Sequence, residues 1–381
     1  MNEAIEQLMR NTLPLEKVHD RLGASFREED NWRVPSSYGD EKAEYATVRE
    51  GGAGLIDLSS RGRLRVAGSE AIMFLNGLIT NDMKMLEENR WMAAAFPNVQ
   101  GRLIAAVRVV RLADESTNKK AGPIFLIETE PATHERVLKT IGRFTMAGDF
   151  RVTDLTSETT LLSVQGKGAM EIARKVLGEA VAGIPRDGAL AIPWQESTVT
   201  VIRATHTGED GFDLIVNTTE AAAIWDSLIE AGAKPIGRDA LEILRIEAGI
   251  ARYGRDMDET NVVTETNLDD AVSFTKGCYI GQEIIARIKY RGHVAKKLSG
   301  LMFEQDEPIE AGAAIKSAEG KDIGRVTSVA RSPRLKRTIA LGYVRYEYLA
   351  ARTSVKVVSG ELEVAATVEV LPFVRGSWDE G

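Results

Sequence analysis

The sequence predicts an α+β protein in which two mixed-sheet α/β domains are followed by a small β-barrel. The chain has 381 residues, and at roughly 150 residues per domain this length indicates two to three domains. Strand-like and helix-like segments alternate up to about residue 290, and hairpin-like turns join several strands, which favours mixed or antiparallel sheets. Beyond about residue 295 only short alternating segments recur, which is typical of a small barrel or sandwich.

Composition excludes several classes of protein. Hydrophobic residues make up 44% and charged residues 27% of the chain, close to the globular average, so the chain is not disordered. No apolar run approaches the roughly 18 residues of a membrane helix, and acids near the start are untypical of a signal peptide. We therefore expect a cytoplasmic protein with no membrane partner. The net charge of −8 argues against direct binding to nucleic acid.

One cysteine and four scattered histidines limit the metal chemistry of the chain. A single cysteine cannot form an internal disulfide, and no CxxC pair exists for zinc. An iron–sulfur cluster normally needs four thiolates. We expect no metal site.

Hydrophobic periodicity predicts the elements up to residue 142. Ser69 is expected to cap the helix that follows it. The other elements, in chain order, are a helix over 3–10, a strand over 62–66, a pair of strands over 102–111 and 124–128, and a helix near 132–142.

The later elements are predicted in the same way. Strands are expected over 161–166, 198–204 and 211–216, and helices over 168–178, 219–231 and 237–250. The predicted barrel strands are 298–303, 323–330, 339–345, 354–359 and 362–370.

The segment Thr205–Val216 places an acid beside a glycine-rich turn. Phe212 and the next two alternate apolar residues share one face of the strand, so Asp213 points to the other face. There it could accept two hydrogen bonds from an amidine-like ligand edge. The ordinary alternative is a solvent-facing acid. His206 is expected to be structural or to line a ligand site.

The helix over 237–250 carries a polar stripe beside its apolar one. Arg238, Glu242 and Arg245 are spaced at i, i+4 and i+7, and Gly249 suits the residue just after the helix end. An arginine fork suits a planar carboxylate better than a lysine does. The alternative is an exposed, salt-bridged face.

The sole cysteine lies in the block KGCYIGQE, residues 276–283. Flanking glycines indicate a tight loop, and the neighbouring Lys276 would favour the reactive thiolate form of Cys278. The alternative is a buried, inert thiol that packs as a small hydrophobe. A basic run from Arg287 to Lys297 follows, which is either a solvated face or a docking site for an anion or a partner.

Together these segments resemble the glycine-cleavage T-protein family of folate-dependent aminomethyltransferases. The similar blocks cover residues 54–68, 207–213, 237–259, 324–344 and 371–374. Within this superfamily, KGCYIGQE is similar to the hallmark of the YgfZ branch, which are folate-binding proteins of iron–sulfur cluster assembly and repair.

The resemblance implies two interleaved α+β domains and a C-terminal β-barrel around a central cavity that holds tetrahydrofolate. The expected domains are 1–50 with 145–240, 51–144 with 241–290, and 295–381. The pterin-binding acid falls on Asp213, where T-proteins have Glu, and a folate-contacting arginine falls on Arg238. Glu209 and Tyr253 are expected to bind the cofactor as well. The motif residues are Lys276, Gly277, Cys278, Tyr279, Gly281, Gln282 and Glu283, with Cys278 as the reactive group.

One block departs from the T-protein pattern. The position of the T-protein catalytic carboxylate falls on Ala105, and its neighbour Ile104 supplies no substitute. General acid–base help of this kind is worth about 100- to 10,000-fold. T-protein catalysis is therefore expected to be lost.

The resulting prediction is a YgfZ-like, tetrahydrofolate-binding protein that assists iron–sulfur cluster assembly or repair. Its expected partners are reduced folate and iron–sulfur enzymes or assembly factors, and the family suggests an indirect link to tRNA modification. One alternative is an active aminomethyltransferase or other one-carbon transferase that uses a different carboxylate. The other alternative is a non-catalytic scaffold with structural folate, binding partners through its basic loop.

Overall fold

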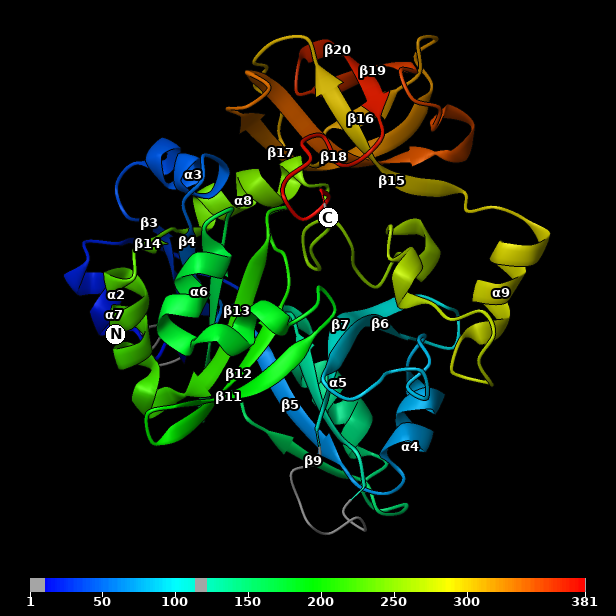
Figure 1. Ribbon diagram of the computed structural model, residues 1–381. Coiled ribbons are helices and arrows are strands. Elements are labelled where there is room, and N and C mark those ends of the chain that lie inside the picture. The colour runs from blue at the N-terminus through cyan, green and yellow to red at the C-terminus, as the bar shows by residue number, and fades with distance from the viewer. Residues whose placement is uncertain (1–10, 114–121, 381) are drawn as a thin grey trace, which may run out of the picture.

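A computed structural model describes residues 11–113 and 122–380. It contains two α+β units and a closed barrel, which confirms the predicted fold class (Figure 1). The predicted helix over 3–10 and most of the polar loop before the strand at 124 lie outside the described residues.

The first unit is built on a six-stranded sheet with the order β11-β12-β13-β10-β4-β14. Its strands are β4 (Gly54–Asp57), β10 (Thr159–Gln165), β11 (Ala189–Trp194), β12 (Ser197–Arg203), β13 (Gly211–Asn217) and β14 (Lys234–Pro235). Helices α6 (Ala169–Leu177) and α7 (Ala221–Glu230) cover one face.

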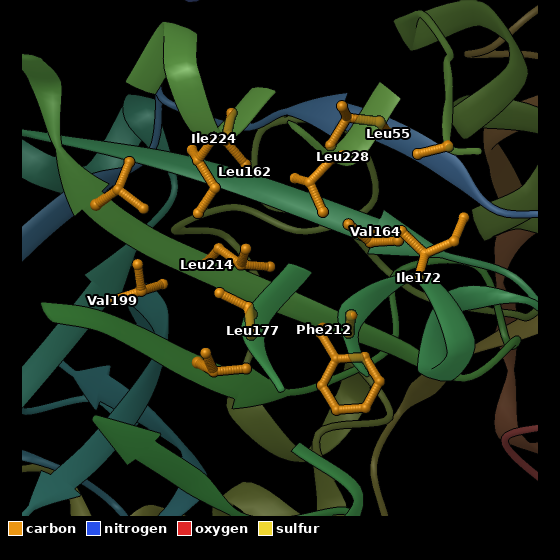
Figure 2. Close-up of a cluster of buried hydrophobic side chains, with 14 of the residues drawn as sticks. Leu55, Leu162, Val164, Ile172, Leu177, Val199, Phe212, Leu214, Ile224 and Leu228 are labelled. Carbon is orange, nitrogen blue, oxygen red and sulfur yellow. The ribbon is translucent and has the colours of Figure 1, made fainter. Parts of the chain in front are cut away.

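Alternation in β13 decides which residues enter the core beneath those helices. Phe212, Leu214 and Val216 are buried among side chains of α6 and α7, as Figure 2 shows for the first two. Successive side chains of a strand point to opposite faces, so Asp213 is directed away from this core. This confirms the predicted face of the strand.

The N-terminal segment adds a small three-stranded sheet with the order β1-β3-β2. Its elements are β1 (Asn11–Thr12), α2 (Glu16–Arg21), β2 (Ser25–Glu29), β3 (Trp32–Ser37) and α3 (Glu41–Arg49). Asp40 accepts hydrogen bonds from the backbone of Lys42 and Ala43, which caps α3.

The second unit is built on a five-stranded sheet with the order β6-β7-β8-β5-β9. Its strands are β5 (Gly62–Ala67), β6 (Arg90–Pro97), β7 (Leu103–Leu112), β8 (Ile124–Thr129) and β9 (Arg151–Asp154). Helices α4 (Ala71–Leu78) and α5 (His134–Gly142) pack on one face. The opposite face meets the six-stranded sheet through a shared core that includes Val110, Leu126, Ile202 and Ile215.

Helix α8 (Arg238–Glu247) lies between the first unit and the barrel, and α9 (Gln282–Arg291) is the last helix before the barrel in the chain (Figure 1). The barrel has the order β15-β18-β17-β16-β19-β20 and closes through the pairing of β15 with β20. Its strands are β15 (Lys296–Phe303), β16 (Ala314–Lys316), β17 (Asp322–Ser332), β18 (Arg337–Arg345), β19 (Ser354–Ser359) and β20 (Leu362–Glu369). Short 3-10 turns are η1 (Pro131–Thr133), η2 (Glu179–Gly183), η3 (Thr218–Glu220), η4 (Val263–Glu265), η5 (Asp269–Ala271) and η6 (Tyr346–Tyr348).

The structure corrects two details of the sequence prediction. Ser69 does not cap α4, because its hydroxyl and amide both donate to Asp149. The predicted domain boundaries also separate two strands from their sheets. Strand β4 begins after residue 50 but pairs with β10, and β9 begins after residue 145 but pairs with β5.

Candidate functional site

A charged cleft lies where the β2–β3 turn, the loop after β4, the start of α8 and the loop after α8 meet. Its volume of about 60 Å³ leaves room for only a few water molecules. A larger ligand therefore needs some of the lining side chains to move. The charged and titratable side chains that line the cleft are Glu29, Asp30, Arg61, Glu130, His206, Arg238, Glu242, Arg245 and Arg252.

Arg238 is a buried cation without a carboxylate partner among the described residues. It is 8% exposed, and its guanidinium donates only to the carbonyl of Asp57 and the hydroxyl of Ser60, both at 3.2 Å. Burial and the charge of Arg61 lower the pKa of Arg238 to about 10, so the group stays charged at neutral pH. A buried cation is costly unless it is paired, so this wall of the cleft suits an anionic or strongly accepting ligand group.

Other arginines of the cleft are already paired with acids. Arg252 contacts Glu29, and Arg61 contacts both Glu130 and Glu128, the latter at 2.6 Å. Burial opposes the charge of Arg61, but the two glutamates outweigh it and raise the pKa of Arg61. These ion pairs occupy the space that a bound ligand would take.

Asp213 lies behind the cleft in a buried cluster that consists of Asp213, Arg108, Glu128, Arg61 and His206. Asp213 is fully buried, accepts from Nε2 of His206 at 2.9 Å and contacts the guanidinium of Arg108. Burial alone would raise the pKa of Asp213, but the charges of His206 and Arg108 outweigh it and lower that pKa. Asp213 is therefore an ionised, paired acid, which excludes the solvent-facing alternative.

Two members of this cluster, His206 and Arg61, line the cleft. His206 is the one that is bonded to Asp213. Its bond to Asp213 orients the ring, and both of its predicted roles, structural and ligand-lining, stay predictions. A pterin could contact Asp213 itself only by replacing His206 or Arg108.

Arg238 and Arg245 of the polar stripe of α8 are buried and Glu242 is partly buried, so the exposed-face alternative is wrong. Arg238, Glu242 and Arg245 all line the cleft. Arg245 is 4% exposed and pairs with Glu242 and with Asp256 in the loop after the helix. Gly249 follows the helix end with φ +69°, as predicted.

Strand β7 carries the position at which the family's catalytic carboxylate is expected, and this chain has alanines there. Ala105 is fully buried and packs in the core under α4. Ala106 points to the other face, which is the face of Arg108 two residues later, and packs near Tyr253. Neither alanine can accept a proton, so this strand offers no carboxylate on either face between Leu103 and Val107.

Two predicted cofactor contacts lie outside the cleft. Glu209 is 2% exposed and binds Arg49 at 2.8 Å and the backbone and hydroxyl of Ser377, so its carboxylate anchors the C-terminal segment. Tyr253 is 5% exposed and packs in an apolar cluster with Leu103. Their partners leave neither side chain directed at a ligand in the cleft.

In the KGCYIGQE loop the thiol of Cys278 is exposed, whereas the ammonium group of Lys276 is buried. Cys278 is exposed, which contradicts the buried alternative. Lys276 is 8% exposed and donates to the carbonyls of Ile79 and Asn81 at 2.9 and 2.6 Å. Burial lowers the pKa of Lys276 to about 8. The expected support of the Cys278 thiolate by Lys276 is therefore weakened, because the ammonium group is turned into the protein.

The remaining motif residues shape the loop and the start of α9. Tyr279 is buried at 8% exposure, and Gly281 has φ +78° at the start of α9. A Cβ at Gly281 would meet the carbonyl of Asn98 at 2.4 Å, so only glycine fits there. Glu283 pairs with Arg287 on the surface of α9, and Gln282 is the first residue of that helix.

Sequence reasoning missed most of the cleft. Glu29 and Asp30 lie at the β2–β3 turn and Glu130 follows β8, and none of these three has a local motif around it. Arg252 lies inside the family-like block 237–259 but was not distinguished there. Arg61 lies inside a family-like block but was not distinguished there. Only the packing of the two units brings these charges together.

The protein therefore consists of two α+β units and a C-terminal barrel, with a charged cleft. Residues 15–276 match the model of the GCVT N-terminal domain, and residues 296–375 match that of the glycine cleavage T-protein C-terminal barrel domain. The chain belongs to the glycine-cleavage T-protein family.

Individual relatives agree with this assignment. The chain is 32% identical over 363 residues to an aminomethyltransferase of Rubrobacter xylanophilus, covering 95% of this chain and 94% of that protein. It is 30% identical to one of Thermotoga neapolitana, covering 96% and 98%. The crystal structure of glycine cleavage system aminomethyltransferase T from Bartonella henselae aligns with a TM-score of 0.85 at 26% identity, covering 96% and 98%. These comparisons show the family, and the assignment to the YgfZ branch stays a prediction.

Tetrahydrofolate is the cofactor of this family, and the cleft fits it in chemical terms. The unpaired guanidinium of Arg238 suits a folate carboxylate or carbonyl, and the acids of the cleft suit the N–H edge of a pterin. The described residues contain no group of three metal-ligating side chains that could hold an ion. They also contain no helix that is long and apolar enough to span a membrane.

Proposed function

We propose that this protein binds a reduced folate in the cleft and acts as a folate-dependent one-carbon transferase. The observation that carries the folate part is Arg238, which is buried, charged and without a carboxylate partner in the described chain. The transferase part is supported by the aminomethyltransferase relatives, which match almost the whole length of the chain.

The nitrogens of tetrahydrofolate would supply the site at which a one-carbon unit is carried. The chain would contribute Arg238 as an anchor for the ligand and Asp213 as the group that keeps His206 oriented toward the cleft. Asp213 could also accept the pterin edge directly if His206 moves. The ion pairs of Arg61 and Arg252 would have to open to admit the ligand.

Since Ala105 and Ala106 offer no carboxylate, a transferase needs another one. Asp30 lines the cleft, and burial together with the charge of Glu130 raises its pKa. A carboxyl group with a raised pKa holds its proton closer to neutral pH, as a general acid or base must. Asp30 is therefore the candidate for proton transfer at the ligand.

Calorimetric titration with tetrahydrofolate tests the binding. Hydrogen bonds to charged groups contribute roughly 1.5–3 kcal/mol, so Arg238→Met and Asp213→Ala should each weaken binding about 10- to 100-fold. Arg90→Met removes the same charge outside the cleft and should bind as the wild type does. Unchanged affinity in both the Arg238 and the Asp213 variants would show that folate does not bind here.

A second candidate function is assistance to iron–sulfur enzymes, as the YgfZ resemblance implies. Two observations favour it: the missing carboxylate in β7 and the exposed Cys278 in the loop that resembles the YgfZ hallmark. A lone thiolate cannot hold a stable cluster. Its role would be a transient sulfur or iron contact, or the capture of a one-carbon unit.

One assay separates the two candidates. Production of methylenetetrahydrofolate from an aminomethylated lipoyl carrier, at about 1–1,000 turnovers per second, supports the transferase, and Asp30→Asn should then abolish it. Background rates in a folate-binding protein support the iron–sulfur role. If Cys278→Ser also leaves iron–sulfur enzyme activity intact in cells that lack the protein, the scaffold alternative is favoured instead.

A further inference from the structure

A second, separate groove lies between the barrel and the loop that follows α8. One wall is the loop from Gly254 to Asn261, and the other is formed by the start of β15, by Gly324–Thr327 of β17 and by Tyr343 of β18. Its volume is about 530 Å³, which is within the usual range for small-molecule sites. It shares no lining residue with the folate cleft.

Three cations line this groove without an ion pair to any described residue: Arg255, Lys296 and Arg325. Among the described residues, the Lys296 ammonium contacts the ring of Tyr343, 4.8 Å from its centre. Gly312 has φ +94°, and a Cβ there would come within 3.2 Å of the Arg325 guanidinium. The glycine therefore leaves room for that guanidinium beside the chain.

Tyr343 adds a buried donor to the same wall. Its side chain is 6% exposed, and its hydroxyl has no hydrogen-bond partner among the described residues. Arg325 is its direct cross-strand partner in the β17–β18 ladder, so the two side chains project from the same face. Burial, together with Glu265 and Asp256, raises the pKa of Tyr343, so the hydroxyl keeps its proton and can donate.

The acids of the groove do not cancel these donors. Asp256 accepts from Thr327 and Ser328 with one oxygen and from Arg245 and the Arg252 backbone with the other. Asp258 accepts from the backbone and hydroxyl of Thr260 with one oxygen, and its other oxygen has no hydrogen-bond partner among the described residues. Three cations and a hydroxyl donor therefore face one partly satisfied carboxylate, and this balance favours an anion.

We propose that this groove binds a small anionic ligand through a carboxylate or phosphate group, with Arg325, Arg255 and Tyr343 as its donors. Arginine forks match both groups in geometry. The groove shares no lining residue with the folate cleft, so a test of this proposal does not decide the proposed function.

The test is calorimetric titration of the full chain at low salt with two probes, inorganic phosphate and γ-linked triglutamate. At least one should bind saturably, and its affinity should fall as salt rises. Arg325→Met should weaken that binding by about tenfold or more, and Tyr343→Phe should weaken it while leaving the thermal midpoint unchanged. Arg334→Met removes the same charge from the β17–β18 hairpin outside the groove and should have no effect.

The two probes identify the source of the ligand. Binding of phosphate alone supports a phosphorylated metabolite, and binding of triglutamate alone supports a polycarboxylate chain. The proposal is overturned if neither probe binds saturably, or if Arg325→Met and Arg334→Met weaken binding equally, because the effect would then come from net charge.

Discussion

The Asp213 cluster and the KGCYIGQE loop differ in how the fold treats their reactive groups. In the cluster the two carboxylates are buried and every charge has a partner: Asp213 and Glu128 face the partly buried Arg108 and Arg61. In the loop the thiol of Cys278 is exposed, while the ammonium group of the neighbouring Lys276 donates to backbone carbonyls. The cluster therefore orients His206 and Arg61 in the cleft. The loop instead exposes the thiol of Cys278, which can react with a molecule in solution.

The largest effect is expected from breaking the cluster. Arg108→Met removes one of the two charged partners of each buried carboxylate, Asp213 and Glu128, and removing one member of a buried pair costs about 3–5 kcal/mol. Urea unfolding measures this loss. The matched control is Arg287→Met on α9, whose exposed pair with Glu283 should contribute less than about 1 kcal/mol. Equal effects of the two variants would remove the distinction between the two regions.

Strand β7 allows the same comparison between its two faces. Ala105→Asp buries a carboxylate in the core under α4 and should destabilise the protein by about 3 kcal/mol. Ala106→Asp lies on the face of Arg108 and should cost less than about 1 kcal/mol. Neither variant alone should restore aminomethyl transfer, since the surrounding block also differs. A tolerated Ala105→Asp, seen in thermal unfolding, would contradict the burial argument.

Acid should weaken the cluster selectively. The folded pKa values of Asp213 and Glu128 are lowered, so their contribution is present above the unfolded values near 4 and is lost as pH falls below them. Unfolding free energy should drop by about 1–3 kcal/mol between pH 6 and pH 3. Arg108→Met should show a smaller drop. A pH dependence that is the same in both proteins would show that these acids are not the cause.

The buried ammonium group of Lys276 is expected to stabilise the conformation of the KGCYIGQE loop. Lys276→Met leaves the carbonyls of Ile79 and Asn81 without their donor, which costs about 1–2 kcal/mol. Amide hydrogen exchange should rise in residues 76–82 and in the loop. Protection equal to that of the wild type would mean that the ammonium group does not hold the loop.

The smallest effect on stability is expected at Cys278. Because the side chain is exposed, Cys278→Ser should change unfolding free energy by less than about 0.5 kcal/mol. Iodoacetamide should label the thiol in the native protein, and labelling only after denaturation would contradict its exposure. The variant should bind folate normally yet fail to restore iron–sulfur enzyme activity if that candidate function is correct.

Patterns in the chain predicted much of the fold because periodicity is a local property. The predicted helices near α5, α6, α7 and α8 and the barrel strands β15, β17, β18, β19 and β20 are present within a few residues. The N-terminal sheet, α2, α3, β4, β6, β9, β11, β14, β16 and α9 were missed. In β2 and α9 charged residues interrupt the apolar ones, whereas β6 and β11 are continuous apolar runs that periodicity alone does not assign to strands.

The sequence by itself determined the family, the alternating strand that buries Phe212 and directs Asp213 away, and the absence of a carboxylate at Ala105 and Ala106. Only the tertiary structure decided that Asp213 is paired, that Lys276 turns inward and that Arg238 lacks a carboxylate. These are questions of which charges meet across distant segments and how far water is excluded from them. Local sequence does not encode either quantity, because the partners come from loops that only the packing of the two units and the barrel brings together.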